Sequence, residues 1–178
     1  METQTCIVSP VEDGFDIEVA SQDINLVQWQ VSQVLNIPAN SVNVSVKRLG
    51  GAYGAKVVLT LHVVSAAAVA ANKLNRPIRL WMNLEDNMRM LGKRNFYLMD
   101  YRMGLTTEGK IVGLESSIYS NSGWNFNDGD SATAAIYSQS CYKIPNIRLS
   151  SFGIKTHTQT PTAARYLEFI LNQTKQWV

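Results

Sequence analysis

Residues 48–56 constrain this chain more than any other segment, because this stretch is rich in residues with little or no side chain. Its sequence, Arg-Leu-Gly-Gly-Ala-Tyr-Gly-Ala-Lys, follows a strand-like run at 42–46 and precedes an apolar run at 57–71. Small residues between a strand and a helix let the backbone approach a ligand closely. The helix that follows would offer free N–H groups to an anion or an oxo group. Tyr53 is the large side chain inside this loop, and we expect it to cap what binds there.

Two common phosphate-binding loops do not match this stretch. A P-loop ending at Lys56 requires Gly at position 55 and Ser or Thr at position 57, where the chain has Ala55 and Val57. A dinucleotide-binding fingerprint starting at Gly50 requires Gly at position 52, where Ala52 stands. A tight strand-to-helix turn without any ligand is the alternative interpretation of the local sequence.

The hydrophobic pattern predicts an α+β fold with mixed sheets and packed helices. Asp23 is the expected N-cap of the first helix, Pro38 is expected to end it, and residues 106–109 form a hairpin turn. Strands and helices do not alternate regularly, which favours α+β layers over a doubly wound sheet. The expected strands lie at 16–19, 42–46, 78–82, 96–105, 110–120 and 147–156, and the expected helices at 24–35, 57–74, 86–91 and 131–139.

Composition excludes several classes of protein. The 178 residues suffice for one domain or for part of a larger one, and a hydrophobic content of 46% is typical of a globular interior. A net charge of +2 gives no reason to expect a nucleic-acid partner. We expect the basic residues at 76–79 and 93–94 to form a solvated face. Cys6 and Cys141 lack the spacing of a metal site and suit a reducing compartment.

The apolar run at 57–71 is the one membrane candidate. It contains Thr60, His62 and Ser65 and is shorter than the roughly 20 residues that cross a bilayer. Residues 1–5 show neither the basic start nor the apolar core of a signal peptide. We therefore expect no membrane contact and a cytoplasmic location.

Further short motifs accompany the loop in a fixed order and spacing. They lie at 36–40, 71–73, 76–79, 85–88, 120–123, 142–148, 155–156 and 162–165. Together with the loop, this series resembles the molybdenum-cofactor-binding part of the aldehyde oxidase and xanthine dehydrogenase family. In that family the loop reads Arg-(Met/Leu)-Gly-Gly-(Gly/Ala)-(Phe/Tyr)-Gly-Gly-Lys. The resemblance implies a partial cofactor-binding domain at 1–165 and leaves a divergent tail at 166–178.

The resemblance also implies cofactors and partners. Family members oxidise a substrate carbon at a molybdenum–oxo–sulfido centre held by molybdopterin, and they take the oxygen from water. 2Fe-2S clusters and FAD are expected only in a full-length parent, which the resemblance implies to be a homodimer. The implied substrate is a small-molecule aldehyde oxidised to a carboxylic acid, with N-heteroaromatic compounds as further candidates.

Five residues are implied to hold the cofactor. Gly51, Ala52, Tyr53 and Gly54 correspond to the family's cofactor loop, and the backbone of the loop aromatic, here Tyr53, lies beside the molybdenum. Arg165 aligns with an arginine near the molybdenum. From local chemistry alone, Tyr53 could instead be an aromatic packed at a turn and Arg165 a surface arginine.

The residues of the implied substrate pocket favour aldehydes over purines. Xanthine dehydrogenases have a glutamate directly after the loop lysine and an arginine in a later segment, and these charged groups can stabilise charge on a purine. This chain has Val57 and Thr133 at those positions, and Leu167 where those enzymes place a stacking phenylalanine. An apolar pocket discriminates weakly, so broad specificity is expected. The alternatives are purine oxidation of the xanthine dehydrogenase type and a non-catalytic binding module that keeps the fold.

Parts of the family's machinery are expected outside this sequence. A glutamine that binds a molybdenum oxo group would lie before Met1, and the general-base glutamate would lie far beyond Val178. We therefore expect a fragment that is inactive by itself, with no catalytic base of its own. His62 and His157 match no catalytic position of the family.

Overall fold

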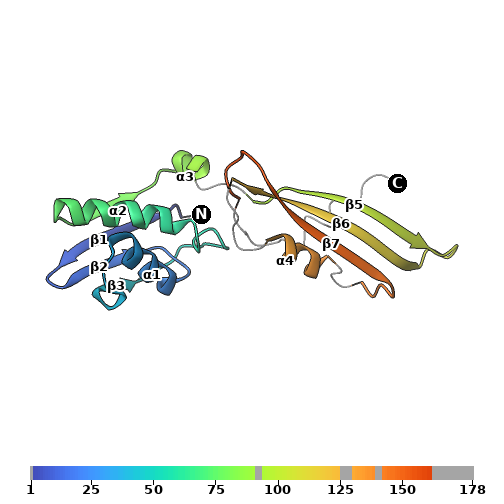
Figure 1. Ribbon diagram of the computed structural model, residues 1–178, viewed down its shortest axis with the longest axis horizontal. Coiled ribbons are helices and arrows are strands. Elements are labelled where there is room, and N and C mark those ends of the chain that lie inside the picture. Colours follow the sequence, from blue (N-terminus) through green and yellow to red (C-terminus); the bar gives the residue numbers. More distant parts are fainter. Residues whose placement is uncertain (1, 91–93, 125–129, 139–141, 162–178) are drawn as a thin grey trace. The chain divides into compact units, whose positions relative to one another are not determined.

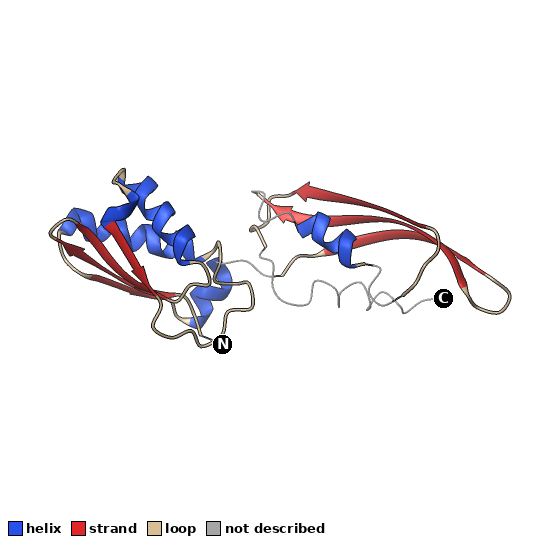
Figure 2. Ribbon diagram, turned by 90° about the horizontal axis from the view of Figure 1, so that it is seen from below, coloured by secondary structure: helices blue, strands red, loops and turns tan. Residues whose placement is uncertain are grey.

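The computed structural model describes residues 2–90, 94–124, 130–138 and 142–161. The chain divides into two compact units, Met1–Leu91 and Gly92–Val178. Each unit contains one sheet with both parallel and antiparallel strand pairs, together with helices (Figures 1 and 2). This arrangement confirms the predicted α+β class. The predicted boundary between a domain at 1–165 and a tail at 166–178 lies outside the described residues.

The first unit is built on a four-stranded sheet. Its strands, in spatial order, are β3 (Val42–Ser45), β2 (Gly14–Val19), β1 (Thr5–Val11) and β4 (Ile78–Trp81). β1 runs antiparallel to both of its neighbours, whereas β2 and β3 are parallel. Val8 lies opposite Ile17, and both side chains are buried because alternate residues of a strand point to the same face.

Two helices cover one face of this sheet and contact each other (Figure 1). They are α1 (Ile24–Leu35) and α2 (Thr60–Leu74); a short η1 (Ala39–Ser41) precedes β3, and α3 (Leu84–Met90) follows β4. The predicted N-cap is confirmed, since the Asp23 carboxylate accepts a hydrogen bond from the Leu26 N–H at 2.9 Å. The expected range 24–35 is confirmed, but the residue that ends the helix is Asn36 and not Pro38. α1 ends before Asn36, which adopts φ 52° and turns the chain out of the helix.

The start of α2 also differs from the prediction, because the helix begins at Thr60 and not at Val57. A helix starting at Val57 would need the Lys56 carbonyl to accept from the Thr60 N–H. That carbonyl instead accepts from the Gln22 N–H at 2.8 Å and from the Ser21 hydroxyl at 3.2 Å. Because of these hydrogen bonds to the segment before α1, the helix begins three residues later than predicted.

The core of the first unit lies between the sheet and these two helices. α2 contributes three alanines, Ala67, Ala68 and Ala71, each at most 1% exposed. Small side chains at this spacing let the helix axis come close to β1. The remaining buried members of the cluster are Cys6, Val8, Phe15, Ile17, Val19, Val27, Val31, Val42, Leu59, Leu61, Val63, Val64 and Met82.

The second unit is a three-stranded sheet with one described helix. The strands lie in the order β5 (Tyr97–Leu105), β6 (Ile111–Gly123) and β7 (Ile147–Lys155), and α4 (Asp130–Tyr137) packs against β6 and β7. The predicted hairpin turn is confirmed, with Gly109 at φ 80° and its N–H bonded to the Thr106 carbonyl at 2.9 Å. β6 and β7 are parallel, and α4 lies in the connection between them.

This second sheet carries large apolar side chains on both faces. Leu98, Tyr119 and Phe152 are paired across the three strands and share one face, where the two aromatic rings stack at 5.2 Å. Tyr101 and Met103 belong to the other face and are also exposed. Among the residues described in this unit, the buried hydrophobic ones are Ile118, Ala134 and Ile144. No helix in the described ranges of the chain is long and apolar enough to cross a membrane.

Candidate functional site

The loop at 48–56 joins β3 to α2 in the first unit and adopts an unusual backbone. Gly51 has φ 118°, Tyr53 has φ 51° and Gly54 has φ 97°. Glycine takes such angles freely, but the left-handed region costs an ordinary residue on the order of 1 kcal/mol. Tyr53 adopts it nonetheless, and the residue is 55% exposed. A conformation of this kind is kept only where surrounding contacts hold it.

The Glu2 carboxylate holds both ends of the loop. Its Oε2 atom accepts from the Gly50 N–H at 2.9 Å, and its Oε1 atom accepts from the Lys56 ammonium group at 2.5 Å. These two donors, the Lys56 ammonium first, hold the pKa of Glu2 below its usual value. A Cβ atom on Gly50 would lie 2.6 Å from Glu2 Oε2, so a larger residue there would require the Glu2 carboxylate to shift.

Gln22 and Ser21 hold the second half of the loop. The Gln22 side-chain Oε1 accepts from the Gly54 N–H at 2.9 Å and from the Lys56 N–H at 3.3 Å. The Lys56 carbonyl in turn accepts from the Gln22 N–H and the Ser21 hydroxyl. The main chain of Lys56 is thus fully bonded to the segment that precedes α1.

Gln4 links the loop to the start of α2 from the other side. Its Nε2 donates to the Ala55 carbonyl at 2.8 Å, and its Oε1 accepts from the Thr60 hydroxyl at 2.6 Å. The Gln4 side chain is buried, so both bonds are formed away from water. Glu2, Gln4 and Gln22 therefore fix a loop that has few side chains of its own.

The loop donors without an acceptor among the described residues include the adjacent N–H groups of Gly51 and Ala52, besides those of the exposed Arg48 and Leu49. No described residue accepts a hydrogen bond from the N–H groups of Gly51 and Ala52, although Ala52 is only 5% exposed. A backbone donor in a buried residue normally has a partner. Two neighbouring N–H groups in a loop of small residues suit an oxygen-rich, anionic group. The loop thus fits the molybdenum–molybdopterin cofactor that the family resemblance implies.

The predicted site residues fall into three groups. Gly51–Gly54 and the half-buried Val57 lie together in or next to the loop of the first unit. Thr133 lies in α4 of the second unit, where the structure describes its backbone alone. Arg165 and Leu167 lie outside the described residues. The structure therefore brings together the loop part of the predicted site.

Glu2, Gln4 and Gln22 are site residues that the sequence did not reveal. Glu2 and Lys56 are 54 positions apart, and Gln4 and Ala55 are 51 apart. No periodic pattern in one sequence links positions so distant. The one available signal was chemical, because a buried loop lysine requires a carboxylate partner.

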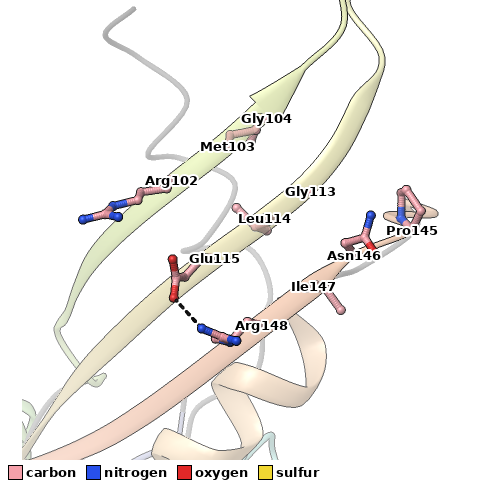
Figure 3. Close-up of a pocket in the computed structure, with 10 residues that line it drawn as sticks. All are labelled: Arg102, Met103, Gly104, Gly113, Leu114, Glu115, Pro145, Asn146, Ile147 and Arg148. Carbon is pink, nitrogen blue, oxygen red and sulfur yellow. Dashed lines mark hydrogen bonds and ion pairs between the residues drawn. The ribbon is translucent and has the colours of Figure 1, made fainter.

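A hollow on the second unit is a possible alternative site (Figure 3). It has a volume of about 660 Å³ and contains none of the predicted site residues. Glu115 and Arg148 form an ion pair of 3.3 Å across its floor, but their side chains are 50% and 79% exposed. Such solvated pairs are ordinary surface features. Within the described ranges, no group of three or more His, Cys, Asp or Glu side chains could hold a metal ion, and His62 and His157 are both exposed.

Comparison with known proteins identifies the class to which this fold and loop belong. Residues 1–167 match the family model of the molybdopterin cofactor-binding domain. The chain belongs to this family, of the type found in aldehyde oxidases and xanthine dehydrogenases.

Individual relatives agree with this assignment. The chain is 38% identical to aldehyde oxidase 3 of Mus musculus over 173 residues, which cover 95% of the chain and 13% of that protein. It is 32% identical to the xanthine dehydrogenase of Blastobotrys adeninivorans over 169 residues, which cover 93% of the chain and 12% of that protein. It is also 33% identical to nicotinate hydroxylase hnxS of Emericella nidulans, covering 93% of the chain and 12% of that protein. The chain therefore spans about an eighth of these relatives.

Solved structures show the same fold. The aldehyde oxidoreductase from Desulfovibrio gigas superposes with a TM-score of 0.81 at 21% identity, covering 93% of this chain and 18% of that one. Quinoline 2-oxidoreductase from Pseudomonas putida 86 gives a TM-score of 0.80 at 20% identity, covering 95% of this chain and 22% of that one.

Proposed function

We propose that residues 48–56 form one wall of a molybdenum–molybdopterin site in an oxidoreductase of the aldehyde oxidase and xanthine dehydrogenase type. The observation that carries this proposal is the pair of N–H groups at Gly51 and Ala52, which have no acceptor among the described residues. They lie in the loop whose sequence matches the family's cofactor loop and whose backbone is held by the Glu2 and Gln22 side chains. When bound, the cofactor would supply the redox centre that oxidises a substrate carbon.

The chain's own residues have a binding and orienting role in this proposal. The Gly51 and Ala52 N–H groups would donate to oxygen atoms of the cofactor, and the exposed Tyr53 ring would shape the space next to it. Preorganised backbone donors of this kind need no rearrangement when they bind a charged group. The hydrogen bonds of the Glu2, Gln4 and Gln22 side chains to the loop provide that preorganisation.

We further propose that the substrate is a small-molecule aldehyde. Val57, directly after the loop, is half-buried and offers no polar group to a substrate. Thr133, on α4, stands where the resemblance places an arginine in purine-oxidising enzymes. A site that must bind the polar edges of a purine depends on such charged partners. Purine oxidation is the second candidate, supported by the 32% identity to a xanthine dehydrogenase.

Cofactor binding can be measured on the 178-residue chain itself. Molybdenum–molybdopterin released from a donor enzyme is mixed with the purified chain, and bound molybdenum per chain is determined by mass spectrometry after gel filtration. Gly51→Ala places a side chain at φ 118° and should weaken binding about tenfold. Gly113→Ala is the matched control, because its Cβ would make only an ordinary 3.6 Å contact with the Asn146 carbonyl. Equal molybdenum contents in both variants, or none in the parent chain, would contradict the proposed site.

A test of the substrate class requires a full-length enzyme that contains this segment. In such a protein, Val57→Glu would restore the carboxylate that the resemblance places after the loop lysine. The ratio of purine to aldehyde turnover should then rise, whereas Val57→Leu should leave it unchanged. A parent protein that already prefers purines would favour the second candidate.

A further inference from the structure

We propose that Gln22 is a positioning residue of the cofactor loop, acting on Tyr53 and Gly54 through their shared peptide bond. The role toward the cofactor rests on the proposed function, whereas the hydrogen bonds between Gln22 and the loop exist without any cofactor. No motif in the sequence marks Gln22, which lies on the exposed corner between β2 and α1.

The geometry gives this one side chain unusual control over the loop. A single acceptor atom, Gln22 Oε1, receives the N–H groups of both Gly54 and Lys56. The Gly54 N–H belongs to the same planar peptide unit as the Tyr53 carbonyl. The hydrogen bond from that N–H to Gln22 therefore also sets the direction of the Tyr53 carbonyl. In this way it fixes the orientation of the whole peptide unit between Tyr53 and Gly54.

The loop needs this control because Tyr53 and Gly54 are the central residues of a turn and both have positive φ, 51° and 97°. Without an external acceptor, the peptide unit between them could flip, which would change ψ of Tyr53 and φ of Gly54 and thus the type of turn. The Ala55 N–H, bonded to the Ala52 carbonyl at 2.9 Å, closes the turn but does not fix this unit. The Gln22 side chain holds this unit directly, because its Oε1 atom accepts from the Gly54 N–H.

The corner that carries Gln22 is itself held by several hydrogen bonds. The Ser21 hydroxyl accepts from the Asp23 N–H at 3.1 Å, and the Asp23 carboxylate caps α1. The Gln22 N–H donates to the Lys56 carbonyl at 2.8 Å, so both the main chain and the side chain of Gln22 form hydrogen bonds with the loop. α1 is therefore coupled mechanically to the loop beside Tyr53.

Amide hydrogen exchange by NMR on the cofactor-free, full 178-residue chain tests this role. Gln22→Leu keeps the size of the side chain but removes the acceptor, and exchange at Gly54 and Lys56 should become about tenfold faster, the effect of losing one typical hydrogen bond. Amides in the middle of α2, such as Ala67 and Ala68, should not change. Gln22→Glu keeps acceptor oxygens and should restore slow exchange at both loop amides.

Gln33→Leu is the matched control, because Gln33 is exposed on α1 and its side chain makes no hydrogen bond within the described residues. Unchanged loop amides in Gln22→Leu, or equal acceleration in the loop and in α2, would overturn the inference. If Gln22→Leu does not fold, the shorter Gln22→Asn gives the same comparison with a milder change.

Molybdenum binding provides a second readout that separates this inference from the proposed function. Gln22→Leu should bind the molybdenum–molybdopterin cofactor about tenfold more weakly than Gln22→Glu or the parent chain. If the parent chain binds no cofactor, the proposed function fails while the exchange result still decides the role of Gln22. If binding is unaffected although the loop amides exchange faster, the positioning role toward the cofactor is overturned.

Discussion

The Lys56 ammonium group lies 2.5 Å from Oε1 of Glu2, and the Lys56 side chain is only 2% exposed. A buried ammonium group is costly unless it is paired and hydrogen-bonded. The same carboxylate also accepts from the Gly50 N–H, so one acidic group joins both ends of the loop. The stability of the first unit and the shape of the candidate site therefore depend on the same ion pair.

Glu2→Gln should destabilise the chain by about 3 kcal/mol, because it leaves a buried charge without its counter-ion. Urea unfolding followed by tryptophan fluorescence would measure this loss. Replacing both partners, in Glu2→Gln/Lys56→Met, should recover much of it, since the unpaired charge is then gone. A double variant as unstable as the single one would contradict the explanation.

The matched control for this prediction is the exposed pair of Lys47 and Glu18. Its two atoms are also 2.5 Å apart, but the side chains are 73% and 47% exposed. Solvent-exposed pairs contribute about 1 kcal/mol or less. Glu18→Gln should therefore change the free energy of unfolding far less than Glu2→Gln, although the two distances are equal.

Acid should weaken the chain through Glu2. Because its pKa is lowered in the folded state, the unfolded chain binds more protons at this group as the pH falls below the usual value of 4.5. The contribution of Glu2 is thus fully present above that pH and is lost on acidification through the lowered folded-state pKa. Urea unfolding between pH 7 and pH 3 should show a steeper loss for the parent chain than for Glu2→Gln. Parallel curves would mean that Glu2 is not the responsible group.

Cys6 should be an unreactive thiol in the folded chain. Burial raises its pKa from 9.0 to about 11, so little thiolate exists near neutral pH. With Cys141→Ser removing the other cysteine, alkylation by iodoacetamide at pH 8 should be at least about 100-fold slower in the folded chain than in urea. Equal rates would show that β1 is not buried as described.

The sequence predicted most elements because their patterns are local. The alternating residues of β2, the Asp23 cap and the turn at Gly109 each involve near neighbours, and all three are present. β1 was not predicted, since it contains Pro10 and is recognised as a strand only through its pairing with β2 and β4. The starting point of α2 was missed for a similar reason, because the Lys56 carbonyl is bound by a segment far away in sequence.

The candidate site divides in the same way. The loop could be located from the sequence because small residues between a strand and a helix are a local signal. The side chains that shape it could not, because Glu2, Gln4 and Gln22 reach it only after the sheet and α1 have formed. The second sheet adds a further limit, since its apolar residues on both faces, such as Leu98 and Met103, give no single buried face to predict from.

Close packing of α2 against β1 gives the last prediction. Ala68 is fully buried, whereas Ala66 lies on the exposed side of the same helix. Ala68→Leu should destabilise the chain by about 2 kcal/mol, because a well-packed core accommodates extra methylene groups only by shifting its neighbours. Ala66→Leu introduces the same residue with a similar helix propensity and should change stability by less than about 0.5 kcal/mol. Thermal unfolding monitored by circular dichroism would compare the two, and equal midpoints would show that α2 is not packed directly on the sheet at Ala68.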